Sequence, residues 1–316
     1  MNNPGIKIFL AYAMLCFIWG STWIAIRFGL ESLTPIFSAG IRFSIASAAI
    51  FVLMRVKGIS VQKDRVSVRL YLLMGFFSFV IPFGLVYWAQ QFVPSGMASV
   101  LFAVYPFWVV IFSYIRMPGE FIGFYKIFGT VLGFSGIVVI FSDSFIGDMN
   151  DYLIGMFAVV LSGTMQAWIA VSIKKFGHHL HPLSMNFIPM VIAAVSMILI
   201  ALFFEDLSST KIDENAVLSV LYLAFFGSVV TFTSFYWLIK HVNVVILSLI
   251  AFITPIVALI LGFLLYSEEL STRHFLGTAL VLTGVVWANL GNLLKLKKGS
   301  IFKTAKEQTP ADEIQS

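Results

Sequence analysis

The sequence predicts an all-α integral membrane protein, in which ten transmembrane helices form two inverted five-helix repeats around a central cavity. Three observations lead to this fold class. Of 316 residues, 59% are hydrophobic and only 11% are charged, whereas about 25% are charged in an average soluble domain. Ten apolar windows are long enough to cross a bilayer. Finally, the two halves of the chain carry matching features in the same order.

The apolar windows define the expected helices. A helix needs roughly 20 apolar residues to cross about 30 Å of hydrocarbon. Short connections join the windows, which cover residues 8–28, 36–55, 70–90, 96–115, 124–142, 152–173, 183–204, 216–238, 243–266 and 274–293. No small-residue cleavage site follows the first window, so we expect a retained helix and not a signal peptide.

The same windows divide the chain into five parts. We expect a cytoplasmic N-terminus at 1–7, a first five-helix repeat at 8–142, an external linker at 143–151, a second, inverted repeat at 152–293, and a cytoplasmic tail at 294–316. The tail is polar and mixed in charge, a composition typical of disorder.

Lysine and arginine predict the orientation. With the N-terminus inside, 16 of these residues fall on the inside and three, Arg27, Lys211 and Arg273, on the outside. This bias predicts a multi-pass protein of the cell inner (plasma) membrane with both termini in the cytoplasm. Because the basic residues are scattered over loops that face anionic lipid, we expect the lipid bilayer as a partner and no nucleic acid.

An internal repeat supports the two-half architecture. The 25 residues from Tyr87, "YWAQQFVPSGMASVLFAVYPFWVVI", align without a gap on "YWLIKHVNVVILSLIAFITPIVALI" from Tyr236, with six identities. After a one-residue shift Glu120 matches Glu268, and "GTVLGFSGIVV" from Gly129 matches "GTALVLTGVVW" from Gly277. Each unit holds five helices, and an odd number inverts the second copy in the membrane, as in many secondary transporters.

The alignment pairs Pro106 with Pro255, each near the middle of its span. Proline removes a backbone hydrogen bond and clashes with the preceding turn. We expect both prolines to break their helices in the same way and to face a cavity, because lipid cannot satisfy the freed carbonyls. The alternative is that they only shape helix packing.

The chain resembles the drug/metabolite transporter superfamily, in its ten-helix EamA branch. The resemblance covers roughly residues 9–292 and rests on "FIWGSTWIAIRFGL" from Phe17, "SLTPIFSAGIRF" from Ser32, "PSGMASVLFAVYP" from Pro94, the Gly119-Glu120 pair and two "GTxLxxxG" segments. It implies two inverted five-helix halves, a central cavity, and export or exchange of small metabolites. The chain departs from the pattern where Ser267-Glu268 replaces the second Gly-Glu pair.

Ionisable residues are almost absent from the predicted spans. None of the 15 Asp and Glu residues lies within a window, and all five histidines lie at or beyond window ends. This distribution argues against a carboxylate proton relay, a metal site, a cofactor and an intramembrane enzyme. An integral-membrane enzyme, or a passive channel or sensor, remains the alternative to a transporter.

Arg42 is the one clear charge inside a window. An unpaired arginine in lipid costs at least about 2.5 kcal/mol on insertion scales. Two interpretations are open: an anchor for an anionic substrate group, or a structural brace between helices. We group Arg42 with the expected structural and gating residues, which also include Pro106, Pro255, Glu120 and Glu268.

Polar and aromatic residues near mid-span are the candidates for substrate binding. They would form aromatic walls with uncharged hydrogen-bond partners, which suits amphipathic metabolites such as amino acids. The set comprises Trp19, Thr22, Trp23, Ser78, Tyr87, Tyr105, Trp108, Gln166, Thr231 and Thr254. The alternatives for each aromatic residue are packing and the interfacial belt.

Glycine strips mark the fifth and tenth windows. Gly129, Gly133 and Gly136 lie in the fifth, and Gly277 and Gly284 in the tenth. Such strips permit close helix approach, either in a homodimer interface or between the two halves of one chain. The sequence thus predicts a secondary transporter, an exporter or exchanger, that alternates access around a midplane cavity. Substrate, coupling ion and oligomeric state stay undetermined.

Overall fold

The structure, a computed structural model, describes residues 4–116, 123–142, 151–177, 179–241, 250–269 and 271–298. Within these ranges the regular structure is entirely helical. Eight helical segments are long and apolar enough to cross a membrane, and the segment 253–266 is a shorter apolar helix. The chain is therefore a multi-pass helical membrane protein by length and composition.

The helices follow one another with short connections. The first half comprises α1 (Pro4–Gly29), α2 (Pro35–Val56), α3 (Arg65–Met74), η1 (Gly75–Val80), α4 (Ile81–Ala89), α5 (Ser95–Phe102), α6 (Tyr105–Arg116) and α7 (Phe124–Ser142). The second comprises α8 (Asp151–Phe176), α9 (Pro182–Phe204), η2 (Leu207–Ser209), α10 (Glu214–Ala224), η3 (Phe225–Val230), α11 (Thr231–His241), α13 (Ile250–Tyr266) and α14 (Thr272–Lys298).

The predicted windows fall largely on helix, although residues 243–249 of the ninth window lie outside the described part of the chain. Three windows contain more than one element. The third and the eighth each join two α-helices through a six-residue π-helix, η1 and η3. The fourth consists of α5 and α6, separated by a short turn at 103–104.

The two π-helices occupy matching places. η1 begins at Gly75 and η3 at Phe225, a separation of 150 residues, close to the 149 residues that separate Tyr87 from Tyr236. A π-helix widens the turn and disrupts the regular i→i−4 ladder, and such segments are frequent at functional sites. Neither π-helix was predicted from the apolar windows.

The expected pair of matched proline breaks is only half correct. Helix α5 ends at Phe102, and α6 begins at Tyr105, directly before Pro106. Helix α13, in contrast, runs without interruption from Ile250 to Tyr266 with Pro255 inside it. A proline removes a single backbone bond, and a helix packed against neighbours on two sides, here α1 and α5, can keep its course.

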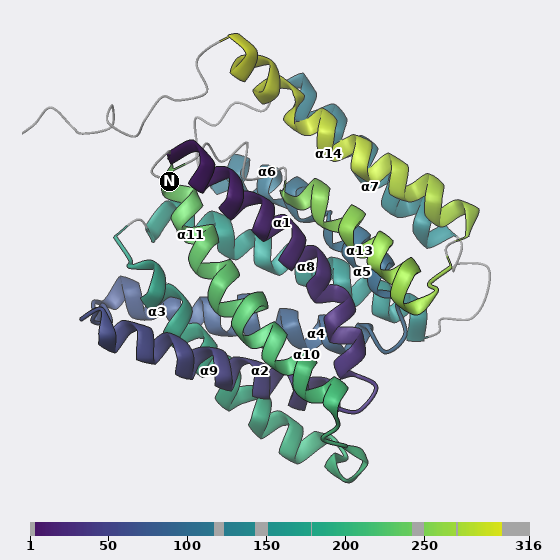
Figure 1. The fold of residues 1–316 in the computed structure, drawn as a ribbon. Helices are drawn as coiled ribbons and strands as arrows, with labels where there is room; N and C mark the ends of the chain where they lie inside the picture. The colour runs from purple at the N-terminus through teal and green to yellow at the C-terminus, as the bar shows by residue number, and fades with distance from the viewer. Residues whose placement is uncertain are drawn as a thin grey trace, which may run out of the picture.

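Helix α1 runs through the middle of the molecule, with α11 on one side and α13 on the other (Figure 1). Helices α2 and α9 lie side by side at one edge, and α7 and α14 form a pair at the opposite edge (Figure 1). Many large apolar side chains on the outer helices are exposed, such as Phe203 and Phe204 at the end of α9. Such an apolar surface fits a lipid environment.

The glycine strips pack against each other within one chain. A Cβ atom on Gly129 would lie 2.5 Å from the carbonyl oxygen of Gly284, and one on Gly136 would lie 2.6 Å from that of Gly277. The backbones of α7 and α14 therefore touch along the strips. The strips therefore pack between the two halves of one chain, as the intramolecular interpretation predicts.

Two helix N-termini are capped by carboxylates from distant parts of the chain. Glu205, after α9, accepts hydrogen bonds from Ile36 N (2.8 Å) and Phe37 N (2.9 Å) at the start of α2. Glu268, after α13, does the same for Ser95 N (2.7 Å) and Gly96 N (2.9 Å) at the start of α5. These bonds satisfy donors that a helix leaves unpaired at its N-terminus.

Candidate functional site

Three of the predicted binding residues lie on one face of α1. Trp19 and Trp23 are half-buried, and Thr22 is buried, with its Oγ1 donating to the carbonyl of Trp19 at 2.7 Å. Residues three and four positions apart share a helix face, so these three side chains lie on the same face of α1. Helix α1 presents this surface to its neighbours in both halves of the chain.

Trp23 lies between the two main hydrophobic clusters. One cluster is built around residues such as Phe43, Tyr87 and Met197, the other around residues such as Met97 and Phe107. Trp23 packs against both. A side chain at the junction of two packed regions stays partly accessible while its neighbours on either side are fixed.

Further aromatic rings surround the two tryptophans. Trp19 contacts Phe232 of α11 at a centroid distance of 5.9 Å, and Phe232 contacts Phe79 of η1 at 5.5 Å. Trp23 contacts Phe102 of α5 at 5.5 Å, and Phe102 stacks on Tyr105 of α6 at 6.1 Å. We call these six residues the aromatic group: Trp19, Trp23, Phe79, Phe102, Tyr105 and Phe232.

The predicted polar residues fall into different surroundings. Thr231 begins α11 next to Phe232, is fully buried, and its Oγ1 has no hydrogen-bond partner among the described residues. Ser78 in η1 and Thr254 in α13 are half-buried. Gln166 is half-buried on α8 and donates to Ser162 of its own helix at 3.5 Å. Thr231 is the polar candidate that adjoins the aromatic group directly in the sequence.

Two further predicted residues make their ring contacts and hydrogen bonds with residues outside this group, although Tyr87 shares a hydrophobic cluster with Phe79. Trp108 packs against Phe112 of its own helix and Phe134 of α7, and its Nε1 is buried without a partner in the described structure. Tyr87 is completely buried and contacts Arg42. Packing explains the placement of both. Glu120, a predicted gating residue, lies outside the described residues.

Arg42 is 2% exposed and joins three parts of the fold. From α2, its Nε donates to Ser228 Oγ (3.0 Å) and its Nη2 to the carbonyl of Gly227 (3.1 Å), both in η3, while its Nη1 donates to Tyr87 Oη (3.2 Å) in α4. Its guanidinium also lies over the ring of Phe83 at 5.0 Å. The recorded partners in the described structure are all uncharged, and these are the contacts that a brace requires.

Helix α1 meets the same π-helix from the other side. A Cβ atom on Gly227 would lie 3.0 Å from Thr22 Cγ2 and 3.4 Å from Arg42 Nη2. The backbone of η3 at Gly227 is therefore held between a candidate binding residue on α1 and the cation on α2. The sequence did not identify Gly227 and Ser228 as candidate residues, because the segment "FFGSVV" contains no pattern that predicts a π-helix.

Apart from Arg42, the ionised groups that the structure describes lie near the helix ends. Hydrogen bonds from the Ser32 hydroxyl and from Ala216 N hold the pKa of Asp213 below its usual value of 3.8. Tyr266 donates to Glu31, which joins the end of α13 to the end of α1. Within the described residues no group of three or more His, Cys, Asp or Glu is placed to hold a metal ion.

Ring faces and uncharged hydrogen-bond partners are side-chain types with which proteins bind amphipathic molecules. The many apolar helices define a class, the multi-pass membrane proteins. The chain belongs to the EamA-like transporter family, whose sequence model matches it twice, over residues 6–142 and 153–290. It is thus a member of a family of membrane transporters.

The chain is similar to several curated proteins. One is "Uncharacterized transporter YoaV" of Bacillus subtilis, with 26% identity over 89% of this chain and 96% of that protein. Another is "Uncharacterized inner membrane transporter YedA" of Escherichia coli, with 28% identity over 92% of each. A solved structure described as "Crystal structure of protein" matches with a TM-score of 0.65 and 18% identity, over 90% of this chain and 98% of that one. This last match shows the fold alone.

Proposed function

We propose that this transporter is an exporter or exchanger of small amphipathic metabolites such as amino acids. It alternates access around a midplane cavity bordered by the aromatic group. Ten spans form two inverted five-helix repeats, 8–142 and 152–293, with α13 and α14 as the last two spans. The N-terminus at 1–7 and the tail at 294–316 lie in the cytoplasm, and 143–151 forms an external linker.

The matched π-helices carry the proposal. η1 and η3 stand 150 residues apart in the third and eighth spans, and the family model matches each half once. The packing is reciprocal: α2 of the first half contacts η3, and α9 of the second half contacts η1. Exchanged contacts of this kind support two related halves that rock against each other about a fixed site.

The two contacts differ in chemistry. Arg42 binds η3 through hydrogen bonds, whereas Ile192 of α9 packs on η1 so closely that a Cβ atom on Gly75 would lie 2.8 Å from it. One half is therefore held by a polar brace and the other by apolar packing. This asymmetry lets the inward and outward states differ in energy even though the halves share one architecture.

The charge distribution supports the orientation with both termini in the cytoplasm, since 16 lysines and arginines fall inside and three outside. The relative YedA is named as an inner membrane transporter, and we place this chain in the same membrane. Reporter fusions after residues 65 and 175 should report cytoplasm, and fusions after 147 and 210 the outside. An outside signal at 65 would overturn the orientation.

Transport is the direct test. The purified protein in liposomes preloaded with unlabelled amino acids should exchange them for labelled ones with no imposed ion gradient, because the predicted spans contain no Asp or Glu for a proton relay. Trp23→Ala should lower exchange more than Trp88→Ala, whose ring lies against Phe92 instead. Strict dependence on a proton gradient would contradict exchange as the mechanism.

A tolerance screen identifies the substrate and the direction. Cells that overproduce the protein are grown on toxic amino acids and analogues, with the Trp23→Ala variant as the control. Export predicts resistance to particular compounds, and uptake predicts sensitivity. Equal growth of both strains on every compound, together with no exchange in liposomes, would refute the proposed substrate class.

A further inference from the structure

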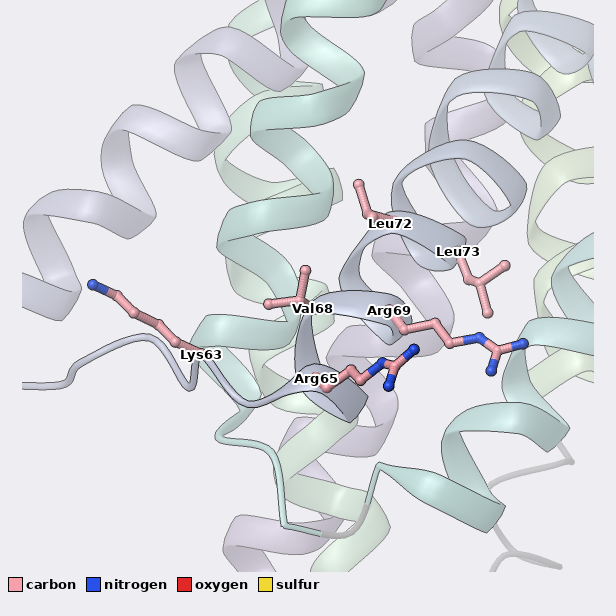
Figure 2. Close-up of a pocket in the computed structure, with 6 residues that line it drawn as sticks. All are labelled: Lys63, Arg65, Val68, Arg69, Leu72 and Leu73. Carbon is pink, nitrogen blue, oxygen red and sulfur yellow. The ribbon is translucent and has the colours of Figure 1, made fainter.

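A basic groove lies at the start of α3, away from the aromatic group (Figure 2). It is open, with a volume of about 750 Å³. Three cationic and three apolar residues line it: Lys63, Arg65, Val68, Arg69, Leu72 and Leu73. The transport mechanism proposed above uses none of them.

The positive charge of the groove is not neutralised by its lining. Arg65 and Arg69 stand one helical turn apart, both exposed, and Figure 2 shows their guanidinium groups extending in the same direction. Within the described residues neither arginine makes an ion pair. Asp64, which directly precedes Arg65 in the sequence, caps α3 instead, with Oδ1 accepting from Val66 N (3.1 Å) and Ser67 N (3.0 Å).

The second carboxylate oxygen of Asp64 also has partners within the chain. Its Oδ2 accepts from the Ser67 hydroxyl and lies 3.7 Å from His179 Nε2. The hydrogen bonds from Ser67 hold the pKa of Asp64 below its usual value. The two arginines therefore offer their donors to a group from outside the chain.

Apolar side chains continue the groove along the helix. Val68 is 44% exposed and Leu72 49%. Beyond them, on the next turn, Phe76 and Phe77 are also exposed, and Phe77 contacts Trp168 of α8 at a centroid distance of 6.0 Å. The surface thus changes from cationic to apolar over two to three helical turns.

We propose that this groove is a binding site for an anionic phospholipid. The phosphodiester of the headgroup lies between Arg65 and Arg69, with Lys63 at the rim, and an acyl chain follows Leu72 and Leu73 toward Phe77. Guanidinium groups match phosphate oxygens in geometry, and basic pockets beside membrane helices suit anionic headgroups. A free phosphate ion would use the arginines but leave the apolar half of the groove empty.

The site rests on the location of the chain in a bilayer and not on the proposed substrate or mechanism. Basic residues at span ends also orient membrane helices, and that role needs charge without a preferred lipid. Two comparisons therefore distinguish these roles. The first compares binding of an anionic and a zwitterionic lipid, and the second compares charge removal inside the groove with charge removal outside it.

Native mass spectrometry of the purified full-length protein, titrated with phosphatidylglycerol or phosphatidylcholine, gives the direct measurement. Wild-type protein should retain phosphatidylglycerol preferentially, and the double variant Arg65→Gln/Arg69→Gln should bind it about tenfold to thirtyfold more weakly. Arg55→Gln/Lys57→Gln removes two charges at the C-terminal end of α2, outside the groove. This control should keep the wild-type affinity.

Three further arms complete the test. Leu72→Ser/Leu73→Ser should weaken lipid binding while leaving the arginines in place, and inorganic phosphate should fail to displace the lipid. Arg65→Lys/Arg69→Lys keeps the charge and should retain most binding. This variant is measured as well, in case the glutamine variant fails to fold. Equal retention of both lipids by the wild type, equal losses in the two glutamine variants, or displacement by phosphate would each overturn the proposal. Transport plays no part in these readouts.

Discussion

Glu268 holds the N-terminus of the helix that begins at Ser95, although 173 residues separate the two in the sequence. Its Oε1 accepts from Ser95 N at 2.7 Å and its Oε2 from Gly96 N at 2.9 Å. The usual helix cap is a residue directly before the helix. Here Pro94 occupies that position and offers no side-chain acceptor, so the carboxylate comes from the other half of the chain.

Removing this cap should destabilise the contact between α13 and α5. We expect Glu268→Ala to lower the free energy of unfolding by about 1–2 kcal/mol, because two backbone donors lose their acceptor. The neighbouring Glu269 is exposed, and Glu269→Ala serves as the matched control. Thermal denaturation in detergent measures both. An equal effect of the two substitutions would show that the cap is not the cause.

Ser267 precedes the capping residue in a left-handed conformation, with φ of 49°. A side chain in this region costs about 1–2 kcal/mol, which glycine avoids. Ser267→Gly should therefore raise the melting temperature, while Ser267→Ala, which keeps the Cβ atom, should not. A lower melting temperature for the glycine variant would contradict this interpretation of the turn.

The approach of α1 to α13 should depend on Gly20. A Cβ atom there would lie 2.5 Å from Val257 Cβ and 3.0 Å from the carbonyl oxygen of Thr254. Gly20→Ala should cost about 1–3 kcal/mol through overpacking and reduce transport, because α1 carries Trp19 and Trp23. Gly84→Ala is the control, since its Cβ atom would meet Ile36 at an ordinary 3.5 Å. Similar losses in both variants would exclude the close contact as the reason.

The two prolines should differ in their effect on accessibility. Pro106→Ala restores a donor just after the break between α5 and α6 and should favour a continuous helix, with loss of transport. Pro255 already lies within a continuous α13, so Pro255→Ala should change transport less. Cysteine labelling from each side, with probes at Thr22 and Thr164 in a Cys16→Ser background, reports the accessible state. Unchanged labelling in both variants would mean that the prolines only shape packing.

Acid should weaken the contact between the α1–α2 connection and the start of α10. Asp213 accepts from the Ser32 hydroxyl and from Ala216 N, and its pKa in the folded protein lies below 3.8. The Asp213 carboxylate thus binds a proton less readily in the folded state than in the unfolded state. Its contribution to the free energy of unfolding is therefore complete above pH 3.8 and is lost as the pH falls below that value.

Hydrogen exchange measures this effect. The amide of Ala216 should keep its protection from neutral pH down to pH 3.8 and lose it as the pH falls further in the wild type. In Asp213→Asn the protection should be lower at neutral pH and should depend less on acid. Asp206→Asn, which removes a carboxylate bound by Ser208 of its own turn, should leave Ala216 unchanged. Constant protection in the wild type across this range would contradict the prediction.

The positions of the spans could be predicted because the bilayer imposes a length and a composition on each helix. Eight of the ten windows coincide with helical segments that are long and apolar enough to cross a membrane in the described residues, and Trp19 and Trp23 lie one turn apart on α1, as the helical period predicts. Local periodicity is enough for such features, since they involve neighbours on a single helix.

Features that depend on distant partners could not be predicted. The acceptors for Arg42 lie in a π-helix 185 and 186 residues away, and Phe232 and Phe102 join the aromatic group only through tertiary packing. The glycine strips were consistent with two partners, because a flat helix surface looks the same whether the second helix belongs to the same chain or to another. Pro255 shows that a proline in the sequence does not fix the course of a well-packed helix.

Arg42 has a consequence for how the protein is made. Translation reaches this residue long before it reaches Gly227 and Ser228, its partners in η3. The second helix thus enters the membrane with a cation whose acceptors have not been synthesised, at a cost of at least about 2.5 kcal/mol in lipid. Nascent chains that stop before Ser228 leave the guanidinium without these two partners. The buried guanidinium therefore obtains these two hydrogen bonds only after the segment 225–230 has been made.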